Sequence, residues 1–243
     1  MDVTETPDQR TMFLVRVTGQ QYTIVEFDRT DPGSPWRMVG APSFSGRWRD
    51  LEEVLTPDGN AMMFSSNRPA QGSSTPIDGH YNGKTWPQGG GRLWIVRRSG
   101  SHWGSPALLA SRVNATTSTF SPAITRDGTL YFMHPTGSNG KFHIFVSQPP
   151  YNVVEPAPFA SATAAEFDPT VSADGKTVIF SSTRGLPSHT VHLFVVYRQG
   201  TRWTPPRDLG RIINFAPVET EARILPGGRL CYSAQGALTC APY

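Results

Sequence analysis

The chain contains no apolar stretch long enough to span a bilayer, no run of basic residues, and only two cysteines among its 243 residues. A membrane-spanning helix needs about 20 mostly apolar residues in succession, so no transmembrane segment is predicted. The net charge is a modest +3 and the basic residues are scattered. A nucleic-acid partner is therefore not expected, because such partners call for clustered positive charge.

Sequence motifs that would identify a catalytic mechanism are also missing. The chain has no His-x-x-x-His zinc pair, no nucleophile elbow, no Walker loop and no dinucleotide fingerprint. Sustained helical periodicity is absent as well. The 23 glycines and 22 prolines, with 37% hydrophobic residues, are typical of a turn-rich all-β protein rather than a disordered one. Whether the protein is an enzyme stays open.

The most informative feature of the sequence is a repeated turn followed by an apolar run. Pro-Asp-Gly at residues 57–59 leads into Phe-Ser-Ser-Asn-Arg at 64–68, and Ala-Asp-Gly at 173–175 leads into Phe-Ser-Ser-Thr-Arg at 180–184. Weaker copies place the residue equivalent to Asp58 and Asp174 at positions 8, 127 and 227. Successive copies are therefore 50, 69, 47 and 53 residues apart. Propeller blades recur at about 40 to 45 residues. One blade per copy is therefore predicted.

Each repeat is predicted to contain an inner strand, the turn, two further strands and a short outer strand marked by Trp-x-x-Pro, at 103–106 and 203–206. Proline suits an edge strand because that strand can spare an amide donor. We therefore expect one all-β domain over residues 1–243, a five-bladed β-propeller of mainly four-stranded antiparallel sheets. Six blades or a β-sandwich are less favoured alternatives. The expected blades are roughly 1–46, 47–114, 115–162, 163–214 and 215–243.

The two cysteines, Cys231 and Cys240, are predicted to form a disulfide. If Gln235 and Gly236 are a two-residue hairpin turn, each cysteine lies four positions from the turn. Directly opposed residues of an antiparallel pair approach to about 4.5 to 5.5 Å between Cα atoms, within disulfide range. Such a bridge would indicate an oxidising compartment; two free thiols in a cytosolic protein are the alternative.

The turn, the Phe-Ser-Ser-x-Arg segment, the following Leu-Trp or Leu-Phe pair and the Trp-x-x-Pro segment together resemble WD40-like, TolB-type (PD40) propeller repeats of bacterial envelope proteins. The resemblance is strongest over residues 47–210. It implies a propeller and a periplasmic or secreted location, with a cytoplasmic one less favoured. Because Met1 lies almost on the first inner strand, we expect an upstream segment such as a signal peptide to be missing from this sequence.

Aligning the copies on the turn identifies two columns of acidic residues at the start of the inner strands. Six positions upstream of the turn, four of the five residues are acidic; eight upstream, three of four are acidic. Side chains alternate along a strand with period two, so both columns are expected to face one mouth of the central channel. The residues are Asp2, Glu52, Ser121, Asp168 and Glu221 in the first column, and Asp50, Thr119, Glu166 and Glu219 in the second.

Carboxylates facing one small space repel each other, which raises some of their pKa values unless a cation or arginine neutralises them. Such a ring could bind a hydroxyl-rich or cationic ligand, carry out acid/base chemistry, or hold a divalent cation. No motif specifies a cofactor. The alternative is that the acids only cap strand ends and form ion pairs with arginines such as Arg47, Arg49, Arg68, Arg184 and Arg223.

A long insertion, residues 69–91, separates two strands of the second repeat. Loops on this side of a blade share a face with the starts of the inner strands, so the insertion is expected to cover the acidic mouth. His80, Tyr81 and Trp86 could then form an aromatic lid over a sugar or another planar ligand. A floppy surface loop is the alternative. His134, which ends a strand where other repeats have serine, is the best histidine candidate for acid/base work.

Three functions are compatible with this pattern. The first is a bacterial envelope propeller that binds a small molecule, glycan or protein segment at the loop-covered mouth. The second is an enzyme, of glycoside hydrolase, lyase or isomerase type, using Glu52, Asp168, Glu221 and His134. The third is a rigid protein-interaction scaffold; in each case a monomer is expected. The predicted ligand-binding residues are Asp2, Asp50, Glu52, Arg68, His80, Tyr81, Trp86, His134, Glu166, Asp168, Arg184, Glu219 and Glu221.

Overall fold

The protein is a five-bladed β-propeller made of five small antiparallel sheets, as predicted. This computed structural model describes residues 2–70, 73–100, 102–137 and 140–243; Met1 and residues 71–72 of the insertion therefore lie outside the described residues. No helix occurs in those ranges. It follows that they contain no helix with the length and hydropathy needed to cross a membrane.

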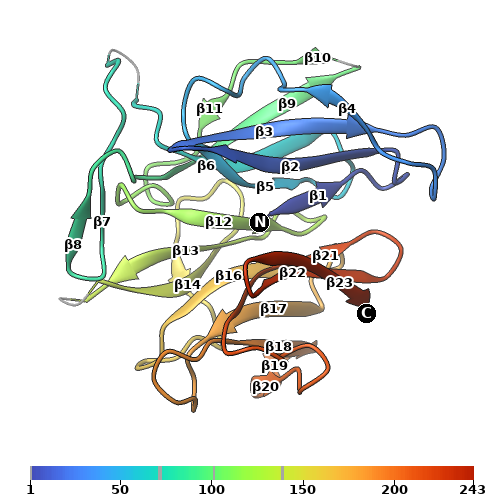
Figure 1. The fold of residues 1–243 in the computed structure, drawn as a ribbon. Coiled ribbons are helices and arrows are strands. Elements are labelled where there is room, and N and C mark those ends of the chain that lie inside the picture. Colours follow the sequence, from blue (N-terminus) through green and yellow to red (C-terminus); the bar gives the residue numbers. More distant parts are fainter. Residues whose placement is uncertain (1, 71–72, 101, 138–139) are drawn as a thin grey trace.

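Four of the five sheets are built on an inner strand, two long strands and a short outer strand (Figure 1). The first contains β1 (Val3–Glu5), β2 (Thr11–Thr18), β3 (Gln21–Asp28) and β4 (Arg37–Gly40). The second contains β5 (Asp50–Leu55), β6 (Ala61–Ser66), β9 (Arg92–Ser99), β10 (His102–Trp103) and β11 (Ala107–Leu108). The third contains β12 (Phe120–Ile124), β13 (Leu130–Thr136), β14 (Lys141–Ser147) and β15 (Glu155–Pro156).

The fourth sheet repeats the second, and the fifth lacks an outer strand within the described chain. The fourth contains β16 (Glu166–Val171), β17 (Thr177–Ser182), β18 (His192–Gln199), β19 (Arg202–Trp203) and β20 (Arg207–Asp208). The fifth contains β21 (Glu219–Leu225), β22 (Arg229–Ala234) and β23 (Ala237–Pro242). The insertion forms a separate hairpin, β7 (Gly79–Tyr81) with β8 (Lys84–Trp86).

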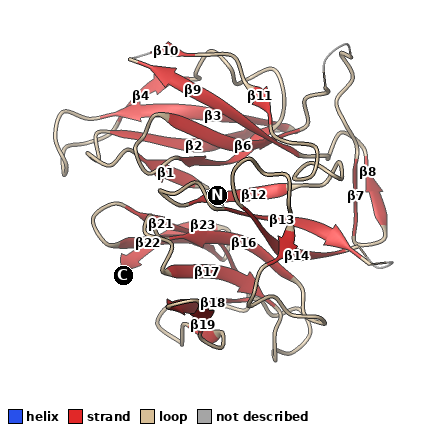
Figure 2. Cartoon of the chain, turned by 180° about the vertical axis from the view of Figure 1, so that it is seen from behind, coloured by secondary structure: helices blue, strands red, loops and turns tan. Residues whose placement is uncertain are grey.

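The inner strands β1, β5, β12, β16 and β21 run through the middle of the molecule (Figure 1; β1, β12, β16 and β21 are also labelled in Figure 2). Each contacts the next around a closed ring. Large apolar clusters fill four of the five interfaces between sheets; Phe13 and Ile24 of the first sheet, for example, pack against Phe64 and Trp94 of the second. The fifth interface is different. Within the described residues, the apolar contact between the last sheet and the first is a small cluster around Val3, Leu225 and Cys231.

Two ion pairs supplement this smaller closing interface, and a disulfide joins the last two strands within the fifth sheet. Arg229 Nη2 lies 2.5 Å from Glu5 Oε2, and Arg223 Nη2 lies 2.6 Å from Asp2 Oδ1. Cys231 and Cys240 stand directly opposite each other in β22 and β23 and are joined as a disulfide, with 4.1 Å between their Cα atoms. The turn between them has positive φ at both Gln235 and Gly236, as a type I′ hairpin requires.

Candidate functional site

The first acidic column occupies a β-bulge that recurs in four of the five sheets. Two residues of each inner strand, beginning with Glu52, Ser121, Asp168 or Glu221, face one aromatic residue of the next strand. All four have positive φ, between 49° and 56°, which is uncommon for residues other than glycine. The bulge turns these side chains out of the regular alternation of the strand.

Through the bulge, the side chains of Glu52, Ser121 and Asp168 each reach the next blade. Glu52 Oε2 accepts the backbone N–H of Ser121 at 2.7 Å, and the Ser121 hydroxyl donates to Asp168 Oδ1 at 2.9 Å. Asp168 Oδ2 in turn accepts the backbone N–H of Glu221 at 3.3 Å. The Asp2–Arg223 ion pair joins the last blade to the first. The column is therefore a belt of polar contacts around the centre of the ring.

Burial raises the pKa values of two carboxyl groups in this belt. Burial, with the charges of Asp2 and Asp168, raises the pKa of Glu52 to about 7, although a Ser65 hydroxyl donates to it at 2.7 Å. Burial and the charge of Asp2 raise the pKa of Asp168 to about 6. Groups with pKa values near neutrality can exchange protons at physiological pH.

A further buried acid, Glu53, was not anticipated. It is fully buried, and neither carboxylate oxygen has a hydrogen-bond partner among the residues the structure describes. Burial, followed by the charge of Asp2, raises the pKa of Glu53 to about 8. The corresponding positions of the other four repeats are Val3, Pro122, Pro169 and Ala222, so no column of acids pointed to it.

The second acidic column faces away from the first, contrary to the period-two prediction. The Glu52 carboxylate accepts a hydrogen bond from the Ser65 hydroxyl, whereas the Asp50 carboxylate accepts one, at 2.6 Å, from the Ser66 hydroxyl. Neighbouring residues of a strand point to opposite sides, so the two acids lie on opposite sides of their own strand. The bulge at Glu52 is the physical reason, because it interrupts the alternation.

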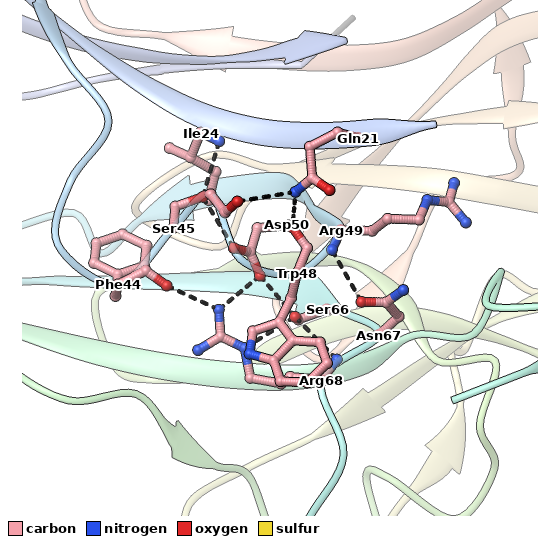
Figure 3. A network of polar contacts seen from close by, with 11 residues as sticks. Gln21, Ile24, Phe44, Ser45, Trp48, Arg49, Asp50, Ser66, Asn67 and Arg68 are labelled. Carbon is pink, nitrogen blue, oxygen red and sulfur yellow. Dashed lines mark hydrogen bonds and ion pairs between the residues drawn. The ribbon is translucent and has the colours of Figure 1, made fainter. Parts of the chain in front are cut away.

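Asp50 instead forms a buried network with the arginine of the Ser-Ser-x-Arg segment (Figure 3). Arg68 Nη2 lies 2.6 Å from Asp50 Oδ1 and also donates to the Phe44 carbonyl at 3.1 Å. The Ser45 hydroxyl donates to Asp50 Oδ2 at 2.9 Å. This network ties the inner strand to the segment that arrives from the preceding blade.

An equivalent arginine–acid pair occurs in the fourth blade. Arg184 pairs with Glu166 and donates to the Phe159 carbonyl at 3.0 Å. Glu219, in the fifth blade, accepts the backbone N–H of Ala216 at 2.5 Å. The Arg–acid alternative raised from the sequence therefore describes Asp50, Glu166 and Asp2. Their carboxylates hold the scaffold together.

The insertion covers the mouth at which Glu52 lies and is docked there through β7 and β8. The N–H of His80 donates to the Ser118 hydroxyl at 2.7 Å, and the N–H of Asn82 donates to the Gly140 carbonyl at 2.9 Å. Both acceptors belong to the third repeat. The β7–β8 hairpin stands beside the ends of β13 and β14 (Figure 1). The described part of the insertion is thus an ordered hairpin that bridges two blades.

Aromatic contacts hold the hairpin over the mouth. Tyr81 stacks on Trp86 with 5.3 Å between ring centroids and packs against Phe120 and Phe142 at 6.0 and 5.1 Å. A cavity of about 150 Å³ lies beneath, lined by Arg49, Glu52 and Tyr81 among others. Tyr81, stacked on Trp86, therefore lines the same small cavity as Glu52, the one belt carboxylate among its described lining residues.

A much larger cavity, about 870 Å³, adjoins the small one between the insertion and the first blade. We call it the insertion groove. It shares Arg49, Tyr81 and Gly89 with the small cavity. Its other lining residues come from the β2–β3 turn, the start of the second blade and the insertion: Thr18, Gly19, Gln20, Gln21, Tyr22, Arg47, Trp48, Asn67, Ser74, Pro76, Trp86, Pro87 and Gln88.

Asn67 fixes the wall of the insertion groove. Its side-chain oxygen accepts the N–H of Arg49 at 2.9 Å, and its amide nitrogen donates to the Gln88 carbonyl at 2.9 Å. Its own backbone carbonyl accepts the N–H of Ile77 at 2.9 Å. One buried asparagine thus connects the second blade to both arms of the insertion. The corresponding residue of the fourth blade, which lacks an insertion, is Thr183.

The two candidate histidines lie outside both cavities. His134 stacks on Phe145 with 3.8 Å between ring centroids, and burial lowers its pKa. The exposed His80 ring lies 3.2 Å from the Thr85 hydroxyl. Neither ring lines the insertion groove or the cavity at Glu52. No group of three or more acids, histidines or cysteines within the described ranges is arranged to hold a metal ion.

The opposite end of the ring, where the Asp-Gly turns lie, has a cavity of about 300 Å³. Residues of all five inner strands or their turns line it, and most are apolar. Arg223 reaches it from the polar belt. The insertion groove, which is larger and more polar than this cavity, lies at the insertion end.

Sequence reasoning missed much of the insertion groove. Trp48 and Tyr22 come from segments without a diagnostic motif. Arg49 was considered only as a partner for acids. Asn67 carried a usable signal, because it is the variable residue of the Ser-Ser-x-Arg segment and lies just before the insertion.

Neither a protein-family profile nor a curated protein sequence matches the chain. Solved structures do. TolB from Acinetobacter baumannii is 14% identical, with a TM-score of 0.53 over 97% of this chain and 51% of that one. Hydrazine synthase from Kuenenia stuttgartiensis is 12% identical, with a TM-score of 0.62 over 99% of this chain and 36% of that one.

A Hadza microbial sialidase, Hz136, is 14% identical, with a TM-score of 0.54 over 99% of this chain and 55% of that one. The chain thus spans about half the length of TolB and of the sialidase, and about a third of the hydrazine synthase chain. At these identities the similarity supports the propeller fold alone.

The Arg68–Asp50 network predicts a large loss of stability when Arg68 is replaced. The Arg68→Met variant should lose about 3 to 5 kcal/mol of unfolding free energy, because Asp50 is left buried and unpaired. Arg37→Met is the matched control, since Arg37 also pairs with an aspartate, at 2.7 Å, but with 79% of its side chain exposed. It should lower the unfolding free energy far less than Arg68→Met does, because solvent screens an exposed ion pair. Equal losses in urea unfolding would contradict this role.

Glu53 predicts a pH-dependent stability. Its pKa is raised to about 8 in the folded protein, so the folded state binds more protons than the unfolded state between about pH 4.5 and 8. The stability contributed by the protonated form is therefore lost as pH rises through that window. Glu53→Gln should raise the melting temperature at pH 9 by at least about 3 °C and change it little at pH 4.5. Destabilisation at both values would refute the assignment.

Proposed function

We propose that this protein is a binding propeller that holds a hydroxyl-rich small molecule or glycan in the insertion groove. The observation that carries the proposal is the groove itself. Its volume, about 870 Å³, lies in the range of 300 to 1,000 Å³ that is typical of small-molecule sites. Asn67 and the docked hairpin give it preformed walls, so little ordering free energy is needed on binding.

The chemistry of the groove walls supports a sugar. Trp86 is 41% exposed and remains stacked on Tyr81, so it presents a supported aromatic face. Trp48 supplies a second aromatic side chain. Flat aromatic faces pack well against the apolar faces of sugar rings. The exposed amides of Gln20 and Gln88 can both donate and accept hydrogen bonds, as hydroxyl groups require.

The cellular setting follows from the repeat pattern and the disulfide. We assign the repeats to the WD40-like, TolB-type class on the motifs described above. The Cys231–Cys240 bridge favours an oxidising compartment such as the bacterial periplasm or the cell exterior. A propeller that binds glycans suits that location.

One observation favours a second candidate, an enzyme acting at the same mouth. Glu52 lines the cavity beneath Tyr81, beside the insertion groove, and burial helps raise its pKa to about 7. A carboxyl group with that pKa can serve as general acid or base near neutral pH. Glu52 would then act on the part of a bound ligand that reaches under the hairpin.

Binding to the groove is testable with two tryptophans. On a glycan array and by calorimetry, the protein should bind at least one sugar, and Trp86→Ala should weaken that binding by about tenfold or more, equivalent to about 1.4 kcal/mol. Trp36→Ala is the control, because Trp36 packs with Arg29 outside the groove, and it should leave affinity unchanged. Equal effects of the two substitutions, or no binding to any sugar, would overturn the proposed site.

Catalysis by Glu52 has a separate test. If the protein converts any sugar that it binds, kcat/KM should change around pH 7, and Glu52→Gln should lower kcat by at least about 100-fold while binding persists. Melting curves would check that the variant remains folded. Binding without turnover in the native protein would favour the non-catalytic function.

A further inference from the structure

We infer that the ligand of the insertion groove is an acidic sugar whose carboxylate is bound by Arg47 and Arg49. This inference rests on the proposed function and specifies its ligand class. The first reason is the charge of the groove. Among the described residues that line it, the charged ones are Arg47 and Arg49, and none is an aspartate or glutamate. A hydroxyl-rich ligand that also carries a negative charge complements such a surface.

The second reason is that neither guanidinium is neutralised within the described chain. Arg47 and Arg49 form no ion pair among the described residues, whereas six other arginines do: Arg10, Arg37, Arg68, Arg184, Arg223 and Arg229. Arg47 lies instead over the Trp48 ring at 4.9 Å, and Arg49 over the Tyr22 ring at 4.4 Å. Contact with an aromatic face leaves the edge N–H groups of a guanidinium free to bind a carboxylate.

One donor of the Arg49 guanidinium is buried. Its Nη1 donates to the Gln88 carbonyl at 3.3 Å, while its Nε is shielded from solvent and has no partner among the described residues. An unsatisfied buried donor is unfavourable. Because the shielded Nε is closed to the groove, a ligand would be bound through the other donors of the guanidinium. Because arginine binds carboxylates in a fixed two-pronged geometry, Arg49 can orient the sugar as well as attract it.

Glu52, the one acid among the described residues that line either cavity, already accepts hydrogen bonds. Glu52 lines the small cavity that Arg49 also lines. Its Oε2, however, accepts hydrogen bonds from the Ser65 hydroxyl and the Ser121 amide, both at 2.7 Å. Glu52 therefore contributes to the belt between blades. The positive charge of Arg49 remains available to a ligand.

The backbone of Arg49 is held rigidly. Its N–H donates to Asn67 Oδ1 at 2.9 Å, and its carbonyl accepts the Asn67 N–H at 3.2 Å. The guanidinium thus projects from a fixed point between the second blade and the insertion, near Trp86. A sugar ring stacked on Trp86 or Trp48 can place its carboxylate toward this side of the groove.

The test compares acidic and neutral sugars that differ only in charge or at one carbon. Calorimetry would use galacturonate with galactose, glucuronate with glucose, and N-acetylneuraminate with its methyl ester, each at low and high salt. At least one acid should bind tenfold or more tightly than its neutral partner, and the difference should shrink at high salt. Trigalacturonate, tested beside the monomer, separates a polysaccharide ligand from a free sugar acid.

Variants distinguish the preference for an acidic sugar from the existence of the glycan site itself. Arg49→Ala and Arg47→Ala should reduce the preference for the acid to less than threefold, whereas Trp86→Ala should weaken acidic and neutral sugars alike. Arg211→Ala is the control of equal charge, because Arg211 is exposed and lies outside the groove. Equal affinity for every acid and its neutral partner would overturn the acidic ligand and leave the glycan site standing. If no sugar binds, both fail together.

Discussion

The carboxylate-to-amide contact between neighbouring inner strands is the interaction on which the rest of the structure depends. Glu52 accepts the amide of Ser121, and Asp168 accepts that of Glu221. Positive φ at the bulge makes each contact possible. The strain of that backbone and the burial of the acids are costs, offset by joining blades near the axis, where there is little room for apolar side chains. The large apolar clusters then stabilise the blades farther out.

Because these polar contacts and apolar clusters stabilise the ring, residues outside them are free to form a binding site. The belt acids join neighbouring blades and the Arg–acid networks stabilise the second and fourth blades, while Glu52 also lines the small cavity. One blade departs from the pattern by inserting a hairpin, and Asn67 ties that hairpin to the second blade. The resulting groove takes its aromatic and cationic residues from positions that the ring does not need. Ligand chemistry can therefore change there without disturbing closure.

The sequence was sufficient to predict the fold and insufficient to orient the acids. Asp-Gly turns need glycine or its equivalent at fixed places, so the five blades could be counted, and the two-residue turn placed Cys231 opposite Cys240. Bulges carry no comparable sequence signal when an acid rather than glycine occupies the positive-φ position. Asp50 and Glu52 were for that reason assigned to one side of their strand. The docking of Tyr81 against Phe142 depends on two repeats meeting in space, which spacing along one repeat could not show.

We propose that the insertion and the first blade form the ligand site, and a crystal structure with the acidic sugar that binds most tightly would test this. We expect a sugar ring in the insertion groove, stacked on Trp86 or Trp48, with its carboxylate at hydrogen-bond distance from Arg49. A sugar bound in the cavity at the turn end of the ring, with the insertion groove empty, would contradict it.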